Sequence, residues 1–467
     1  MFWLELLVVL AALALGARLG GIFLGIAGGL GLAFLVFVFG LAPSAPPIDV
    51  MLIITAVIVA ASVLQVAGGM DYLVSVAEKI LRSNPKYITF LAPMVCYLFT
   101  FMAGTGNIAF ALLPVIAEVA RETGVRPERP MSISVVASQQ AITASPVSAA
   151  MAALVALLSP LGVGMGQIML VCVPATLIGC FLGALSVCKR GVELDKDPVY
   201  QRRLAAGVIK ASESREKVAF VPKKGAKLSV AIFVLGAVLI VLFGTIPSLR
   251  PTFMVEGKLV TLSMTHIIEI IMLVVAGVVS LLCKPNIDEV AKSSVFQAGM
   301  TGVICIFGLA WMGDTLITAY LPDIKAMTQA FVQDHPWTFA VGLMCVASVV
   351  LSQAATTRLL YPLAIALGLS PIALVASWPA TGCLYIIPTY ATIVAGCAFD
   401  STGTTHIGKY VINHSYLIPG LITTCSSVAI GFAIAQGSVR ISVSGEVIPG
   451  AAQRGCPLFF CDAVCQT

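Results

Sequence analysis

Residues 88–120 read ITFLAPMVCYLFTFMAGTGNIAFALLPVIAEVA, two apolar runs separated by Gly104-Thr105-Gly106-Asn107. Basic connections flank the segment on both sides, and Lys and Arg mark the cytoplasmic ends of membrane spans. A single span cannot begin and end on one side, so the segment is expected to enter the membrane, turn at the interruption and return. Irregular backbone is tolerated at that depth only where protein buries it or where it lines an aqueous cavity. The flanking basic residues are Lys79, Arg82 and Lys86 before the segment, and Arg121, Arg126 and Arg129 after it.

The composition of the 467-residue chain supports a membrane location. Hydrophobic residues make up 59% of the chain, charged residues only 10%, and the mean hydropathy is +1.02. A soluble domain is typically about 25% charged, so this chain has too little charge to cover a surface in water. Since a transmembrane helix takes about 20 apolar residues, the length leaves room for roughly ten spans.

The first half of the chain, residues 1–188, contains the hairpin and five predicted spans. Arg18 and the basic connection from Asp71 to Tyr87 are expected inside, which puts the N-terminus outside. The predicted elements are spans near 3–17, 21–41 and 49–68, the hairpin 88–120, a span at 131–158 broken at Thr143-Ala144-Ser145-Pro146, and a span at 167–188.

The second half, residues 228–436, follows a basic stretch at 189–227 that is predicted to be a cytoplasmic loop. It repeats the order of elements of the first half, upside down. The predicted elements are spans near 228–247, 264–283 and 298–318, a hairpin at 337–369 interrupted from Ser352 to Thr357, a span at 371–398 broken at Pro388-Thr389, and a last span near 415–436. The C-terminal tail, 437–467, is expected outside as well and reads as an unstructured extension.

These elements predict an all-α integral membrane protein built from two inverted-topology repeats. Five crossings per half invert the second copy relative to the first, giving about ten transmembrane helices plus two re-entrant hairpins, with helices broken at the midplane. The two halves align by the order of their elements, and Pro146 of the first broken span matches Pro388 of the second. This plan is typical of secondary transporters.

The four interruptions are the best candidates for a binding site. The second half of a broken helix begins with free N–H groups and the positive end of the helix dipole, which attract anions such as carboxylates. Short hydroxyl and amide side chains add hydrogen bonds, and Gly104 and Gly106 allow a sharp turn. The alternative is that these small residues only pack helices closely. The predicted site residues are Gly104, Thr105, Gly106, Asn107, Thr143, Ser145, Pro146, Ser148, Ser352, Gln353, Thr356, Thr357, Arg358, Pro388 and Thr389.

Charged residues near the interruptions have open roles. Arg358, inside an apolar segment, is expected either to pair with a substrate carboxylate or to pair with an acid or reach the surface. Asp400 begins a hydroxyl-rich run with Thr402 and Lys409, and it is either functional or a solvated residue at the end of a span. A ridge of small residues, Gly21, Gly25 and Gly29, predicts close helix packing.

Other function classes lack support. The net charge of +5 is spread over connections, so no nucleic-acid partner is expected. No ATP-binding loop of the form G-x-x-x-x-G-K-[ST] occurs. No CxxC pair occurs and the histidines show no ligand spacing, so no metal or other cofactor is expected. No nucleophile and base are paired, so the chain is not expected to be an enzyme.

Short strings distributed along the chain resemble the anaerobic C4-dicarboxylate transporter (Dcu) family. The resemblance covers about residues 4–436 and is specific only when the strings are taken together. The matching strings are GARLGG (16–21), QVAGG (65–69), NPKYIT (84–89), AGTGN (103–107), LPVIAEVA (113–120), AITASP (141–146), SQAA (352–355), PTY (388–390), TGTT (402–405) and IGK (407–409).

The resemblance implies exchange of fumarate, malate, aspartate and succinate across the bacterial inner membrane during anaerobic respiration. The outer side of that membrane is the periplasm, so the N-terminus and the C-terminal tail are expected there. It also implies a regulatory role for Asp400 and Thr402, because some relatives report dicarboxylate to a sensor kinase. Where relatives usually have Arg after TGTT, this chain has His406, which weakens any charge at that position near neutral pH. The expected partners are a small dicarboxylate and membrane lipid, with a sensor kinase and a second copy of the chain left open.

Two function classes follow from these patterns. The leading hypothesis is a dicarboxylate antiporter, or a cation-coupled symporter, that works by alternating access. The alternative is a membrane receptor or regulator that binds dicarboxylate without moving it.

Overall fold

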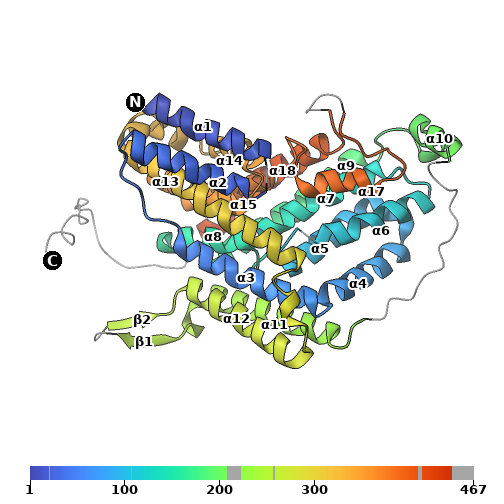
Figure 1. The fold of residues 1–467 in the computed structure, drawn as a ribbon, viewed down its shortest axis with the longest axis horizontal. Coiled ribbons are helices and arrows are strands. Elements are labelled where there is room, and N and C mark those ends of the chain that lie inside the picture. The colour runs from blue at the N-terminus through green and yellow to red at the C-terminus, as the bar shows by residue number, and fades with distance from the viewer. Residues whose placement is uncertain (20, 107, 208–221, 256–257, 409–412, 444–467) are drawn as a thin grey trace.

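The protein is almost entirely helical, as predicted. This computed structural model describes residues 1–19, 21–106, 108–207, 222–255, 258–408 and 413–443 (Figure 1). The first half contains α1 (Phe2–Leu19), α2 (Phe23–Ala33), α3 (Ile48–Val66), α4 (Gly69–Ser83), α5 (Ile88–Ala103), α6 (Ile108–Glu122), α7 (Glu128–Ala144), α8 (Ala149–Leu158) and α9 (Met165–Val187).

The second half begins after α10 (Pro198–Ala205), a short helix in the basic stretch that was predicted to be a loop. It contains α11 (Ala226–Thr245), the hairpin of β1 (Thr252–Val255) and β2 (Lys258–Thr261), α12 (Met264–Cys283), α13 (Ser294–Asp334), α14 (Thr338–Val350), α15 (Gln353–Ala366), α16 (Pro371–Ser377), α17 (Ala391–Phe399) and α18 (Leu417–Val443).

The helices are long and apolar enough for a multi-pass membrane protein. Within the described ranges, seven helices could cross a membrane by length and composition, or up to eight if a bent pair counts as one span. Shorter apolar helices cover Phe2–Gly16, Phe23–Val38 and Thr338–Val350. The count of about ten crossings therefore stays a prediction.

Both hairpins form at the predicted interruptions. α5 and α6 meet around Gly104, and α14 and α15 meet at Leu351 and Ser352. The first broken span is interrupted between α7 and α8. The second is broken over a longer stretch than Pro388-Thr389, because a 3₁₀ turn at Trp378–Gly382 follows α16 and the helix resumes only at Ala391.

Two local predictions were wrong. The connection Asp71–Tyr87 is not a loop: α4 begins at Gly69, lies at 70° to the end of α3, and buries Leu73, Ala77 and Leu81 on one face. α18 continues to Val443, into the segment predicted to be an unstructured tail. These two errors share a cause, since apolar runs locate lipid-facing helices and miss amphipathic or polar extensions.

Two further features were not expected. They are the β1–β2 hairpin and the full 41-residue length of α13. The predicted span 298–318 lies inside α13, whose residues Ser294–Asp323 are long and apolar enough to cross a membrane.

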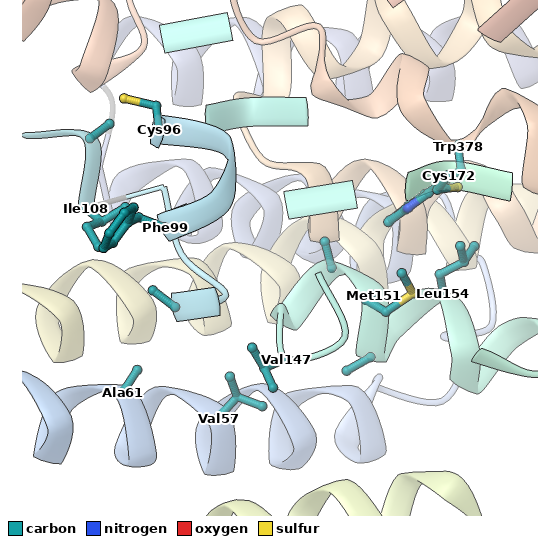
Figure 2. Packing of buried hydrophobic residues seen from close by; sticks show 14 of the residues in the cluster. Val57, Ala61, Cys96, Phe99, Ile108, Val147, Met151, Leu154, Cys172 and Trp378 are labelled. Carbon is teal, nitrogen blue, oxygen red and sulfur yellow. The ribbon is translucent and has the colours of Figure 1, made fainter. Parts of the chain in front are cut away.

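The helices pack in pairs that join the two halves of the chain. α2 packs along α13 and α3 along α12, while α9 packs along α18 (Figure 1). The largest buried cluster connects hairpin α5–α6, the α7–α8 break and α3, with Phe99, Ile108, Val147 and Val57 among its members (Figure 2). The hairpins are therefore buried in protein, as irregular backbone in a membrane requires.

The glycine ridge on α2 packs against α13 through a different face than predicted. A Cβ on Gly25 would lie 2.3 Å from the carbonyl oxygen of Ile304, and one on Gly28 would lie 2.5 Å from the carbonyl carbon of Gly308. Gly29 faces open space, and Gly21 has no atom within 4 Å of a built Cβ. Gly25 and Gly28 therefore pack against α13, spaced three residues apart as on one helix face. Gly31, three residues further on, faces Met312 of the same helix.

We predict that Gly28→Ala destabilises the protein, because the added methyl overpacks backbone that cannot move aside. The expected loss is about 1–3 kcal/mol, seen as a lower midpoint of thermal unfolding in detergent. Gly29→Ala is the matched control and should be neutral or slightly stabilising, since Ala favours helix more than Gly. Equal midpoints for the two variants would contradict the assigned helix face.

Candidate functional site

A cavity of about 730 Å³ lies where the broken elements meet. Its walls are the tip of hairpin α5–α6, the tip of hairpin α14–α15 and the start of α17, closed on the other side by α2, α3 and α13. At one end it reaches Gly21, Ser294 and Gln297, which are exposed. The predicted site residues that line it are Gly104, Thr105, Gly106, Ser352, Gln353 and Thr389.

The tip of hairpin α5–α6 is shaped by Gly104. Its φ is +68°, a left-handed conformation that glycine adopts without strain, and its N–H donates to the Thr100 carbonyl at 2.8 Å. A Cβ on Gly104 would lie 2.5 Å from the carbonyl oxygen of Val147, in the α7–α8 break. Ser145 from the same break donates to the Phe101 carbonyl at 2.7 Å. The hairpin tip and the break therefore form one packed unit. Asn107 lies outside the described residues.

The hydroxyls of the first broken span are used to hold the break together. Thr143 donates to the Gln140 carbonyl at 2.7 Å, and Ser148 donates to the Ile142 carbonyl at 2.8 Å while accepting from the Met151 N–H at 3.0 Å. The cavity walls do not include Thr143, Ser145, Pro146 or Ser148. Their place there is taken by the first two residues of α8, Ala149 and Ala150.

Hairpin α14–α15 reaches the cavity through the first turn of α15. Ser352 caps this helix by accepting from the Ala355 N–H at 3.3 Å, and Gln353 follows it. Thr356 and Thr357 donate to main-chain carbonyls four residues back and do not line the cavity. Of the polar side chains predicted in this interruption, only Ser352 and Gln353 are in position to contact a ligand in the cavity.

Arg358 lies away from the cavity walls and faces an acid. Its Nη2 is 4.0 Å from Oδ2 of Asp314 on α13, and both side chains are largely buried. The pair connects the second hairpin to α13. Of the two expectations for Arg358, the geometry matches pairing with an acid.

The second broken span contributes the residues around the start of α17. Thr389, Tyr390 and Thr392 line the cavity, while Pro388 is buried outside it. Trp378 ties this span to the first one, because its indole N–H donates to the Thr143 carbonyl at 2.6 Å.

Gln139 on α7 joins three of the broken elements, and the sequence analysis missed it. Its main-chain carbonyl accepts from Gln353 Nε2 at 2.8 Å, and its own Nε2 donates to Thr392 Oγ1 at 3.3 Å. A Cβ on Gly106 would lie 3.6 Å from the same Nε2. The available signal was the Gln139-Gln140 pair inside an apolar span, where polar side chains are costly unless bonded.

The electrostatics of the cavity come from main chain and not from ionised side chains. Among the described lining residues there is no Asp, Glu, His, Lys or Arg. The first turns of α6, α8, α15 and α17 all contribute to the walls. Each such turn presents N–H groups without intrahelical partners and the positive end of a helix dipole. This arrangement favours a small anion.

Asp400 lies in a separate polar network. Its carboxylate is 2% exposed and accepts from Thr402 N–H at 2.9 Å, Thr404 Oγ1 at 2.9 Å and Thr405 N–H at 2.6 Å, and from the Thr402 hydroxyl. It is therefore not a solvated residue at the end of a span. Asp400 and Thr402 do not line the cavity, and Lys409 lies outside the described residues.

Loops next to the Asp400 network carry buried ion pairs. Glu128, at the start of α7, pairs with Arg126 at 2.7 Å and Arg190 at 3.5 Å, and Arg126 also pairs with Asp197. Burial alone would raise the pKa of Asp197, but the Tyr200 N–H, the Arg126 guanidinium and the Val199 N–H lower it below the ordinary range. The ion pairs join the connection before α7 to the stretch after α9.

Comparison with known proteins identifies the family. Residues 1–439 match a family described as "Anaerobic c4-dicarboxylate membrane transporter". The chain belongs to this family. A C4-dicarboxylate transporter DcuA of Wolinella succinogenes is 47% identical over 92% of this chain and 98% of that protein. DcuA of Escherichia coli K12 is 46% identical, and an Escherichia coli anaerobic C4-dicarboxylate transporter DcuB is 40% identical.

Membership in this family makes the chain a multi-pass membrane transporter and not an enzyme. Two solved structures share its fold at 14% identity: the Alcanivorax borkumensis YdaH transporter, with a TM-score of 0.54 over 90% of this chain and 98% of that one, and Neisseria gonorrhoeae MtrF, with 0.51 over 87% and 84%. The predicted resemblance is thus confirmed at the level of family and of helical transporter fold.

We predict that Gly104→Ala abolishes transport and lowers the thermal unfolding midpoint. The substitution adds left-handed strain of about 1–3 kcal/mol, and its methyl would also meet the Val147 carbonyl. Gly124→Ala is the matched control, because Gly124 has φ +72° but no atom within 4 Å of a built Cβ. Gly124→Ala should show the strain alone and keep transport. Equal effects of the two variants would mean that contact with the α7–α8 break is unimportant.

Proposed function

We propose that this chain is a secondary transporter that exchanges C4-dicarboxylates, such as fumarate, malate, aspartate and succinate, across the bacterial inner membrane. The proposal is supported by relatives named C4-dicarboxylate transporters over almost their full length. It is also supported by a cavity of about 730 Å³, which is within the usual range for small-molecule sites.

The observation that carries the proposal is the ring of half-helix N-termini around a cavity without charged walls. A dicarboxylate has two anionic ends, and the starts of α6, α8, α15 and α17 offer N–H groups and partial positive charge to both. A lysine or arginine in the same place would bind the anion more strongly and release it more slowly. Exchange requires release at each face, so neutral donors suit it better than a fixed cation.

The pairing of helices supports an inverted-repeat mechanism. If α1–α3 correspond to α11–α13, then the α2–α13 and α12–α3 contacts are equivalent to each other. The same holds for the α15–α8 and α17–α6 contacts, each of which joins a hairpin arm from one half to a broken span from the other. Such related contacts favour two states that expose one central site to opposite faces.

The structure corresponds to an inward-open state under this proposal. The cavity reaches Gly21 and Ser294, next to Arg18 and to the basic connection before α13, which the charge rule makes cytoplasmic. The N-terminus would then be periplasmic.

The second candidate function is a dicarboxylate-binding co-sensor that does not transport. The buried Asp400 loop supports this second candidate. The hydrogen-bond network around Asp400 lies apart from the cavity and on the predicted cytoplasmic side, where a sensor kinase would have access. A regulator of this kind would bind dicarboxylate but show no counterflow.

The experiment that tests the proposal is counterflow in proteoliposomes. Vesicles loaded with unlabelled succinate should accumulate labelled succinate from outside without ATP. Excess fumarate, malate or aspartate should suppress uptake, while acetate and other monocarboxylates should not. Repeating the assay with and without sodium and pH gradients separates obligatory exchange from symport. Binding of succinate without any counterflow would favour the co-sensor.

A further inference from the structure

Gln353 has a fixed orientation at the cavity wall. It is the first residue of α15, its side chain is only 4% exposed, and the residue lines the cavity. Its Nε2 donates to the Gln139 carbonyl at 2.8 Å. Because a carbonyl accepts only from the nitrogen of the amide, this bond also decides where the amide oxygen points.

The amide oxygen of Gln353 has no hydrogen-bond partner among the described residues. A buried acceptor without a donor is unfavourable, so natural structures rarely keep one unless a ligand or water completes it. Neither neighbouring hydroxyl completes it in the structure: the Thr392 hydroxyl accepts from Gln139 Nε2, the Ser352 hydroxyl accepts from the Ala355 N–H, and neither donates to the Gln353 oxygen. The position is therefore ready for a donor that the protein does not supply.

The same residue presents an anion site and an acceptor side by side. The N–H groups of Gln353 and Ala354 belong to the first turn of α15, which suits a carboxylate. The side-chain oxygen of Gln353 suits a hydrogen-bond donor attached close to that carboxylate. An α-amino or α-hydroxy acid has this arrangement, since its donor is on the carbon next to the carboxylate. Succinate and fumarate have no such donor.

We propose that Gln353 determines specificity among C4-dicarboxylates by accepting a hydrogen bond from an ammonium or hydroxyl group at C2. The proposal rests on the proposed function above. It assigns L-aspartate and L-malate one contact more than succinate and fumarate at the same site.

The test is counterflow by Gln353→Met, which keeps the length of the side chain and removes both polar atoms. The concentrations of aspartate and malate that give half-maximal exchange should rise about tenfold, as expected for one lost hydrogen bond, while those of succinate and fumarate should change less than about twofold. Gln353→Asn, which keeps the amide but shortens it, should show a smaller loss in the same direction and serves if the Met variant does not fold. Gln201→Met, at an exposed position on α10 away from the cavity, is the matched control and should leave the exchange of all four substrates unchanged.

Several outcomes would overturn the proposal. An equal change for all four substrates would make Gln353 a structural residue. An unchanged profile would show that the oxygen does not contact substrate. If Gln353→Met raises only the sodium concentration that gives half-maximal exchange, and does so for every substrate, then the Gln353 oxygen binds a cation instead of the substrate. If the unmodified protein exchanges no dicarboxylate, the proposed function itself fails and this assignment falls with it, a result distinct from the other three.

Discussion

The structure depends on the rule that main-chain N–H and C=O groups must be satisfied inside a membrane. An unbroken helix meets this rule alone, but a broken one must find partners at the break. Here the breaks supply partners to each other: Ser145 bonds to the carbonyl of Phe101 in the neighbouring hairpin, and the Trp378 indole bonds to the Thr143 carbonyl. The four interruptions therefore assemble in one place because none of them is stable in lipid by itself.

This requirement divides the polar residues of the interruptions into two groups. Thr143, Ser145, Ser148, Thr356 and Thr357 donate to main-chain carbonyls and keep the breaks closed. The first turns of α6, α8, α15 and α17 are left at the cavity wall. Under the proposed function the main chain forms the binding surface, and its partial charges take the role that lysine or arginine has in many anion sites.

The sequence predicted the elements well and the contacts between them poorly. Gly104, Ser145 and Ser352 interrupt apolar runs, so the breaks can be located from residue type alone. The basic connections on either side then indicate which breaks belong to hairpins. Charge and hydropathy could not reveal α4, because an amphipathic helix with several charges resembles a loop by composition. Gln139 was missed for another reason: its importance comes from Gly106, Gln353 and Thr392, which lie far from it in the chain and reach it only in the folded state.

We propose above all that main-chain N–H groups at the helix breaks bind the dicarboxylate in the cavity. The most direct test is an experimental structure of the protein with bound succinate. We expect succinate between the first turns of α15 and α17, with its carboxylates within hydrogen-bond distance of main-chain N–H groups near Gln353 and Thr392. Succinate bound instead at Arg358, or at the Asp400 loop, with the cavity free of it, would contradict the claim.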